Sequence, residues 1–223
     1  MGKIEEIYGA NQSNFFFKNL YLARKKHHEM IIPFISNEDE ILDIGTTPIL
    51  DNHENFFLNH YKFPDKITCF SDQNLDKLKT NFPNLKAIRG DGRNTNLPDS
   101  SYDIVISNAT LEHVGSNQNQ CKFIKELYRI SKKRCIITTP NRYFPIDSHT
   151  MLPLIHWLPK KIHRKILSVI GHKYLSEEKN LNLLKTSNLV YMMKNFRNIE
   201  FKFRYVKFLM IKSNIILIGK KKD

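Results

Sequence analysis

The sequence predicts a doubly wound α/β fold with a mostly parallel sheet, and three observations carry that prediction. Short apolar runs of strand length alternate along the chain with segments of helical periodicity. The first such run, residues 40–45, closes on a glycine, as buried parallel strands often do. Polar side chains gather just after successive runs, where ligands bind in such sheets. Alternating strands and helices imply right-handed crossovers and helices on both faces of the sheet.

Each element follows from its local pattern. Runs rich in β-branched and apolar residues predict strands at 40–45, 67–71, 85–88, 102–107 and 134–139. Helical spacing of apolar residues predicts helices at 4–32, 51–61, 72–80, 123–130 and 174–195. Two further strands, at 201–207 and 214–219, are close enough in the chain to pair as an antiparallel hairpin.

Length and composition set the class of protein. The 223 residues, of which 41% are apolar and 26% charged, fit a single domain over 1–223, with an N-terminal helical segment at 1–36 and an insertion at 141–173. Three separated cysteines and the lack of a signal-like or membrane-spanning run predict a cytoplasmic protein without disulfides. The net charge of +13 predicts attraction to anions. The alternative is that the charged side chains only keep the surface solvated.

The first two strand ends carry candidate ligand contacts. Gly45 follows a buried strand and lets backbone approach a ligand, while Asp43 could anchor a cationic amino group. An ordinary turn explains the same residues, and Thr47 and Ile49 stand where a dinucleotide-binding loop has glycines. At the second strand end, Asp72 could accept ribose hydroxyls or could cap the next helix.

The next two strand ends complete a series. Gly90-Asp91-Gly92-Arg93 ends the third strand, and Asn108-Ala109-Thr110-Leu111-Glu112-His113-Val114 ends the fourth. In this order, the four segments resemble a class I S-adenosylmethionine-dependent methyltransferase of the type 11-like subgroup. The resemblance covers about 38–145 and the terminal hairpin. It implies a Rossmann-like, seven-stranded, three-layer α/β/α sheet whose last strand is reversed, and S-adenosyl-L-methionine as cofactor.

The resemblance also implies roles for individual residues. Those implied to bind the cofactor are Asp43, Gly45 and Asn108 at the methionine end, Thr46 in the loop, Asp72 at the ribose, and Gln73, Asp91 and Gly92 around the adenine. Two features depart from the family pattern. Thr47 and Ile49 replace loop glycines, and the family's ribose-binding acid aligns with Ser71, one residue before Asp72.

Candidates for the chemistry lie after the fourth and fifth strands. His113 is the best candidate for a general base by residue type, although its ring could instead form only a hydrogen bond with the backbone. The segment 139–149 should overhang the cleft, and its candidate substrate contacts are Asn141, Arg142 and Tyr143. Asp147 and His149 form a candidate catalytic acid/base pair. The alternatives are that Asp147 caps a helix and that Arg142 is solvated.

The block 151–170 has apolar and basic residues on opposite helical faces. We favour a lid over the active site, and the alternative is a peripheral contact with anionic membranes. His149, His156 and His163 recur every seven residues, but Pro153 and Pro159 interrupt any helix that could align them, so no metal site is predicted.

The sequence therefore predicts an enzyme that methylates a small molecule. We expect O-methylation of a phosphorylated metabolite, a nucleotide-activated sugar or a surface-glycan precursor, as in polysaccharide biosynthesis, by a monomer or a homodimer. The alternatives are an RNA methyltransferase and a catalytically inactive partner protein that kept the fold. The chain has no base-flipping aromatic clamp after the fourth strand and no added nucleic-acid module, so nucleic acid is not favoured as a partner.

Overall fold

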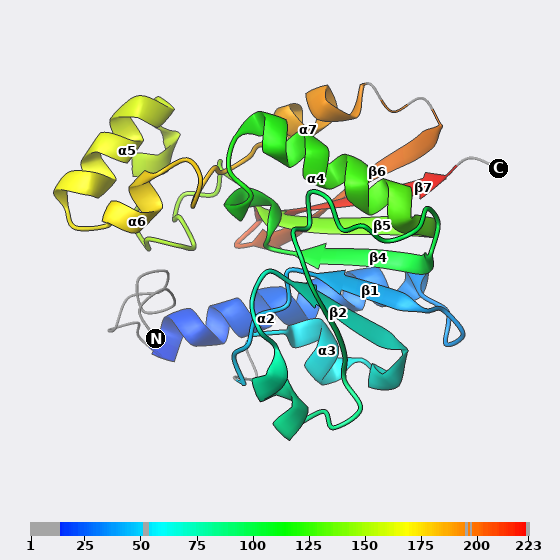
Figure 1. The fold of residues 1–223 in the computed structure, drawn as a ribbon. Helices are drawn as coiled ribbons and strands as arrows, with labels where there is room; N and C mark the ends of the chain where they lie inside the picture. The colour runs from blue at the N-terminus through cyan, green and yellow to red at the C-terminus, as the bar shows by residue number, and fades with distance from the viewer. Residues whose placement is uncertain (1–13, 51–53, 195, 197, 222–223) are drawn as a thin grey trace.

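A seven-stranded sheet forms the centre of the protein in the computed structural model, which describes residues 14–50, 54–194, 196 and 198–221. The strands are β1 (Ile41–Ile44), β2 (Ile67–Ser71), β3 (Lys86–Arg89), β4 (Tyr102–Asn108), β5 (Ser131–Pro140), β6 (Ile199–Phe208) and β7 (Ile211–Lys221). Their order is β3-β2-β1-β4-β5-β7-β6, and β7 runs antiparallel to both neighbours while β1 to β5 are parallel (Figure 1). The predicted fold class and its reversed last strand are confirmed.

Helices cover both faces of the sheet. The α-helices are α2 (Asn14–Ile31), α3 (Phe56–His60), α4 (Asn117–Ile130), α5 (Lys160–Val169), α6 (Lys173–Ser176) and α7 (Thr186–Met193). Short 3₁₀ helices are η1 (Ile32–Phe34), η2 (Pro64–Lys66), η3 (Asp76–Thr80), η4 (Leu111–His113) and η5 (Ile155–Trp157). The start of α4 follows from its sequence, because the Ser116 side chain accepts a hydrogen bond from the Asn119 amide and caps the helix.

Two apolar cores hold these layers together. On one face, Phe123 and Leu127 of α4 and Leu189 of α7 pack against the sheet. On the other face, Ile31 of α2 and Phe57 of α3 pack against the opposite side chains of the same strands. Successive strand residues point to opposite faces, so the fully buried central strands supply both cores. This arrangement is the expected three-layer α/β/α stack.

Some expected helices are shorter than their periodicity indicated. The helix expected over 174–195 is two helices, α6 and α7, separated by extended chain; that prediction was wrong. Within this stretch the Asn182 amide donates to the Glu112 carbonyl at 2.7 Å, so tertiary contacts replace helical hydrogen bonds. The helix expected over 72–80 is reduced to η3, and the one over 51–61 to α3. Residues 1–13 and 51–53, which fall within two predicted helices, lie outside the described residues.

The chain between β5 and α7, residues 141–185, is called here the cap segment. It carries η5, α5 and α6, which lie beyond the carboxyl ends of the parallel strands (Figure 1). It has a small apolar cluster of its own, in which Leu167, Leu175, Leu181 and Leu183 are buried. In the part of the chain that the structure describes, no helix is both long and apolar enough to cross a membrane.

Candidate active site

A cavity of about 730 Å³ opens at the carboxyl ends of β1, β2, β3 and β4. Its position is the crevice at the switch in strand order, where β1 lies between β2 and β4. All eight residues that the sequence predicts as cofactor ligands line it: Asp43, Gly45, Thr46, Asp72, Gln73, Asp91, Gly92 and Asn108. The fold thus brings four segments that are distant in sequence to one wall.

The end of β1 places a buried carboxyl group at this wall. Asp43 is 6% exposed, and burial raises its pKa to about 7. Gly45 follows with a φ of +101°, and a Cβ atom there would lie 2.0 Å from Oγ1 of Thr110. A glycine is therefore required here, because both the backbone conformation and the closeness of the β4 loop exclude a side chain.

The loop after Gly45 takes its shape from Asn55, a residue that sequence reasoning missed. The Asn55 side chain accepts from the Thr47 amide at 2.9 Å and donates to the Thr47 carbonyl at 2.8 Å and to the Ile49 carbonyl at 3.2 Å. Asn55 itself has a φ of 47°, a conformation that asparagine tolerates better than most residues. Side-chain hydrogen bonds thus hold a loop in which Thr47 and Ile49 replace glycines. All three residues line the cavity.

The ends of β2 and β3 supply exposed acidic groups. β2 ends at Ser71, so Asp72 is the first residue beyond it, and the Ser71 hydroxyl accepts from the Gln73 amide at 3.2 Å. Asp72 does not cap a helix, since η3 begins after Leu75 without a side-chain cap. Asp91 pairs with Arg93, whose Nη2 lies 2.6 Å from Oδ2, and hydrogen bonds from Arg93 lower the pKa of Asp91.

The end of β4 carries Asn108 and a tight turn. The Asn108 side-chain oxygen accepts from the Thr138 hydroxyl of β5, which fixes the amide against the sheet. Ala109 follows with a φ of 50°, and its amide donates to the Thr138 carbonyl at 3.0 Å. The turn directs the chain into η4, which contains Glu112 and His113.

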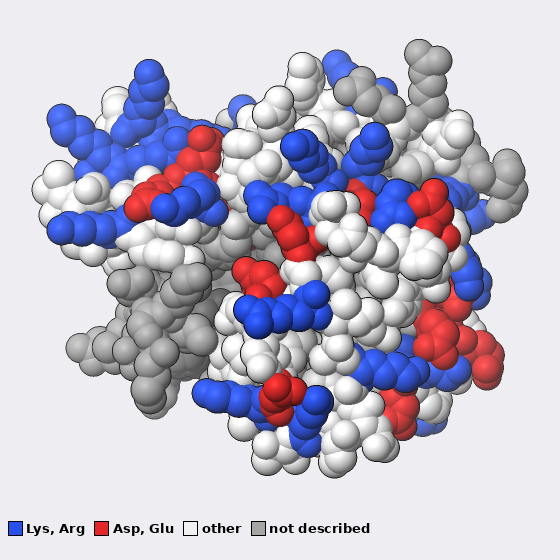
Figure 2. Space-filling view, viewed as in Figure 1, with Lys and Arg blue, Asp and Glu red and all other residues white. Residues whose placement is uncertain are grey.

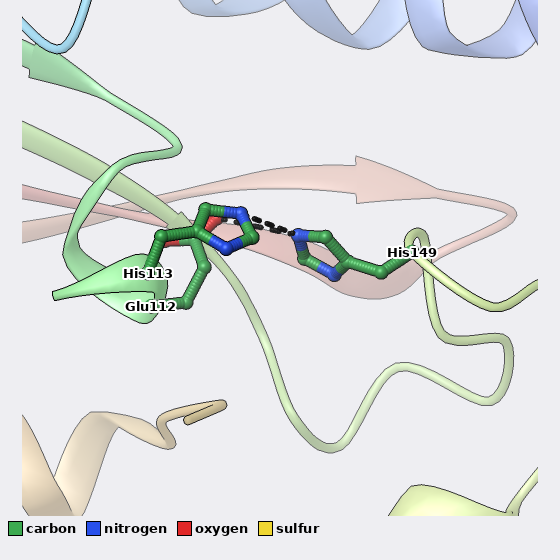
Figure 3. Close-up of side chains that lie close together, drawn as sticks. All are labelled: Glu112, His113 and His149. Carbon is green, nitrogen blue, oxygen red and sulfur yellow. Dashed lines mark hydrogen bonds and ion pairs between the residues drawn. The ribbon is translucent and has the colours of Figure 1, made fainter. Parts of the chain in front are cut away.

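Four ionisable side chains converge beside η4: Glu112, His113, Asp147 and His149 (Figure 3 draws three of them). The Nε2 atoms of His113 and His149 lie 3.1 Å apart, and His149 Nδ1 lies 3.2 Å from Oδ1 of Asp147. Nδ1 of His113 lies 2.7 Å from the Asn180 carbonyl. His113 lines the cavity, whereas Asp147 and His149 lie behind that wall. Both nitrogens of His113 are therefore engaged.

Burial and pairing move the pKa values of this group in opposite directions. Burial lowers the pKa of His113 to about 4 and raises that of the Glu112 carboxyl. Burial alone would lower the pKa of His149, but its hydrogen bond to Asp147 and the charges of Asp147 and Glu112 together raise it. Asp147, held by hydrogen bonds from His149 and Thr150, has a lowered pKa. Asp147 does not cap a helix; it accepts from the His149 amide at 3.1 Å and from the Thr150 hydroxyl at 2.8 Å.

The predicted substrate contacts after β5 fasten the cap segment in this structure. Arg142 is not merely solvated, since its guanidinium donates to the carbonyls of His156 at 2.9 Å and Leu158 at 2.8 Å. Asn141 Nδ2 donates to the Lys212 carbonyl at 2.9 Å. Tyr143 is 54% exposed and receives a hydrogen bond from Lys185. None of these three side chains lines the cavity.

Instead, the cap segment contributes Tyr174, Lys179 and Asn180 to the cavity wall. Sequence reasoning missed these residues because it placed them in a continuous helix. Asn182 holds this stretch in place: its Nδ2 donates to the Gly115 carbonyl at 2.8 Å, and its own carbonyl accepts from Gln120 at 2.8 Å. The run of asparagines at 180 and 182, which favour turns, was the signal available.

Comparisons with known proteins agree with this geometry. Residues 67–138 match the family model described as "Methyltransferase domain". No curated protein sequence matches the chain. Solved structures share the fold. A possible histamine N-methyltransferase from Thermotoga maritima has 16% identity and a TM-score of 0.54, covering 92% of this chain and 95% of its own.

Two further structures contain S-adenosylhomocysteine. Magnesium protoporphyrin IX methyltransferase from Synechocystis PCC 6803 has 12% identity and a TM-score of 0.58, covering 98% of this chain and 93% of its own. A Burkholderia thailandensis 1,6-didemethyltoxoflavin-N1-methyltransferase has 10% identity and a TM-score of 0.58, covering 91% of this chain and 80% of its own. The match over residues 67–138 agrees with the resemblance to S-adenosylmethionine-dependent methyltransferases, and the solved structures show that the chain shares their fold.

Proposed function

We propose that this methyltransferase transfers the methyl group of S-adenosylmethionine to an oxygen atom of a small, phosphate-bearing acceptor. Acceptors of this class include phosphorylated metabolites, nucleotide-activated sugars and surface-glycan precursors. One observation carries the proposal: a single cavity is lined both by the strand-end motifs and by Tyr174, Lys179 and Asn180 of the cap segment. Cofactor and acceptor can therefore meet in one cavity.

The donor set of the cavity fits the cofactor. The buried Asp43 carboxyl suits the amino group of the methionine end, and Asp72 and Asp91 at the next strand ends suit the ribose and adenine. A Cβ at Gly92 would lie 2.6 Å from the Phe123 ring, so close packing against the core requires a glycine beside the predicted adenine site. When bound, the cofactor supplies an electrophilic methyl group on a sulfonium. The chain's own residues orient the two substrates, which is the main requirement of an in-line displacement.

An oxygen nucleophile must also lose a proton, and the proposed acid–base group is His113, His149 and Asp147. His113 faces the cavity, and its Nε2 contacts Nε2 of His149 at 3.1 Å. Asp147 fixes the orientation of His149 through Nδ1. Nδ1 of His113 is held by the Asn180 carbonyl, so the proton of the acceptor would pass to Nε2 of His113 once its contact with His149 opens.

A cluster of cations in the cap segment supports an anionic acceptor. Arg142, Lys160 and Arg164 lie close together: burial lowers the pKa of Lys160, and the charges of the two arginines lower it further. Glu178 offsets part of this repulsion, because it pairs with Arg164 at 3.1 Å. The Lys160 ammonium contacts Oδ1 of Asn182, so the cluster adjoins the stretch that borders the cavity. Figure 2 shows Lys and Arg side chains gathered over the region of α5 and α6. A phosphate group would relieve this repulsion.

Turnover with labelled S-adenosylmethionine tests the proposal. A panel of phosphorylated acceptors should be methylated, and Lys160→Gln should raise their KM about tenfold, because one buried charge contact is lost. The matched control is Lys165→Gln on the same helix. Turnover of neutral acceptors alone would sink the phosphate proposal. Methylation of RNA, with binding that weakens steeply with salt, would favour the RNA alternative. Failure to bind S-adenosylhomocysteine would favour an inactive partner protein.

The exposed face of α5 supports the peripheral membrane contact considered for 151–170. His163 and Leu167 face the protein, whereas Ile162, Val169 and Ile170 on the opposite side are 50%, 79% and 48% exposed. Lysines flank this apolar strip, as in helices that rest on anionic lipid. Such a contact would bring the cap close to a lipid-linked glycan precursor. Sedimentation with anionic vesicles tests it.

A further inference from the structure

We infer that Glu112, His113 and His149 form a binding site for one divalent transition-metal ion of the zinc class. One ligand atom from each residue lies within 4.8 Å of the others (Figure 3). Two imidazole nitrogens and a carboxylate oxygen are a donor set that such ions prefer. The three residues come from η4 and from the start of the cap segment, so the site joins the end of β4 to the cap.

The hydrogen bonds behind the ligands determine which ring nitrogens are free. Nδ1 of His113 lies 2.7 Å from the Asn180 carbonyl, which can only accept, so this nitrogen carries the proton. Nδ1 of His149 likewise faces the Asp147 carboxylate at 3.2 Å. Nε2 of each ring therefore presents a lone pair. The two Nε2 atoms lie 3.1 Å apart, an arrangement that is repulsive unless a cation lies between them.

The surroundings of Glu112 indicate whether the cation between the two rings is a proton or a metal ion. Its side chain is fully buried, and Oε1 has no hydrogen-bond partner, although it lies 3.8 Å from Nε2 of His149. The other oxygen, Oε2, accepts from the Thr139 hydroxyl at 2.8 Å. A proton shared by the two rings would leave Oε1 unpaired in the interior, which is costly. A metal ion would use all three atoms.

The dimensions and the surroundings suit such an ion. Metal–ligand distances near 2.0–2.1 Å place ligands about 3.3 Å apart in a tetrahedral site, close to the separations of 3.1 and 3.8 Å found here. Each ligand has a supporting hydrogen bond: Asn180 for His113, Asp147 for His149 and Thr139 for Glu112. Supporting shells of this kind orient the ligands of metal centres. His113 lines the cavity, so the ion would border the acceptor end. While the ion is bound, neither Nε2 atom has a free lone pair, so the metal-bound state excludes the acid–base role proposed above for the histidine pair.

Metal titration of the complete protein tests the site. After treatment with a chelator, the wild type should bind one equivalent of Zn²⁺ in competition with a chromophoric chelator. Glu112→Gln and His149→Gln should each weaken that binding at least about tenfold. His172→Gln, at a histidine outside the cluster, is the matched control and should bind as the wild type does. Absence of stoichiometric binding, or equal affinity in all four proteins, would overturn the inference.

A spectrum of the wild type covers the case in which the variants fail to fold. Co²⁺ in place of Zn²⁺ should give the intense visible absorption of a four- or five-coordinate ion. A weak spectrum, typical of six-coordinate Co²⁺ in water, would contradict the site. Neither measurement depends on the acceptor, so the metal site and the proposed substrate class can fail separately.

Discussion

The cavity has two walls that are built differently. The strand-end wall consists of short loops attached to buried strands, and its polar residues face the space between them. The cap wall consists of α6 and the irregular chain around it. Its polar side chains mostly donate hydrogen bonds to backbone carbonyls: Arg142 donates to those of His156 and Leu158, and Asn182 donates to that of Gly115. Ligand contacts can thus be read from motifs on the first wall, whereas polar residues on the second serve mainly to fasten it.

The walls also differ in how they are stabilised. Two large cores anchor the strands, with strand residues such as Ile41, Val105 and Ile136 fully buried. The cap has a cluster of four buried leucines and exposes several large apolar side chains, among them Val169 and Trp157. We therefore expect changes at the strand ends to affect cofactor binding, and changes in the cap to affect the acceptor and local stability.

The largest effect should come from Gly45→Ala. The new Cβ would lie 2.0 Å from Oγ1 of Thr110 on a backbone with a φ of +101°. Strain and overlap together cost about 3 kcal/mol, which corresponds to about a 100-fold loss of S-adenosylhomocysteine affinity by calorimetry. Gly171→Ala is the matched control, since Gly171 has a φ of +97° but no atom within 4 Å of the added Cβ. Equal affinity in both variants would show that the loop shifts to accommodate the added Cβ atom.

Asn182→Ala should be the most damaging change to the cap wall. It removes the hydrogen bond to the Gly115 carbonyl and the contact with Lys160 from a site that is 2% exposed. We expect a loss of about 2–3 kcal/mol in the free energy of unfolding, measured by urea titration. The KM of the acceptor should rise, while affinity for S-adenosylhomocysteine stays within about twofold. A parallel loss of cofactor affinity would mean that the walls are coupled.

Asn55→Ala should loosen the strand-end wall without a steric clash. Three hydrogen bonds to Thr47 and Ile49 disappear, so the observed loop conformation should lose about 1–2 kcal/mol of stabilisation. Affinity for S-adenosylhomocysteine should fall about tenfold. Asn74→Ala, which removes a single exposed hydrogen bond to the Asp76 amide, is the control and should leave affinity unchanged. Unchanged affinity in Asn55→Ala would show that the loop needs no such support.

Asp43 should make cofactor binding depend on pH. Its pKa of about 7 in the free protein means that the carboxyl is mostly neutral at pH 6, whereas an ammonium ligand favours the ionised form. S-adenosylhomocysteine affinity should be about tenfold weaker at pH 6 than at pH 8, and Asp43→Asn should flatten this dependence. An unchanged profile in the variant would assign the titration to another group.

The same raised pKa has a consequence for stability. The folded protein binds the Asp43 proton more tightly than the unfolded chain does, so this contribution is complete below about pH 4 and is lost as pH rises through about 7. The stability of the free wild type relative to Asp43→Asn should therefore fall across that interval. Thermal unfolding in a series of buffers measures the difference.

Changes on the outer face of α5 should have the smallest effect on stability. Replacement of Ile162, Val169 and Ile170 by serine alters side chains that are 48–79% exposed, so each change should shift the free energy of unfolding by less than about 0.5 kcal/mol. Binding to anionic vesicles should nevertheless be lost, because the apolar strip is removed. Retained vesicle binding would assign the contact to another surface.

Much of the fold and of the strand-end wall could be predicted from the sequence. In the run 102–107, the apolar residues 104–106 are buried on both faces of the sheet, so their pattern does not depend on distant partners. The residues that follow them must lie at one edge of a parallel sheet, which is why all eight predicted cofactor ligands line one cavity. Their roles toward the cofactor stay predictions. Asn55 could not be recognised, because its function depends on a loop path that backbone geometry decides.

The sequence by itself determined the layered sheet and the place where ligands bind, because periodicity and strand ends are local properties of the chain. Only the tertiary structure decided the cap wall. There, Asn182 broke a helix that local spacing predicted, since the Glu112 carbonyl offered its amide a distant partner. The tertiary structure also brought His149 next to His113, although the two residues are 36 positions apart in the chain. Contacts between residues so far apart in the chain produce no periodic pattern in the sequence, because they depend on the path of all the residues between them.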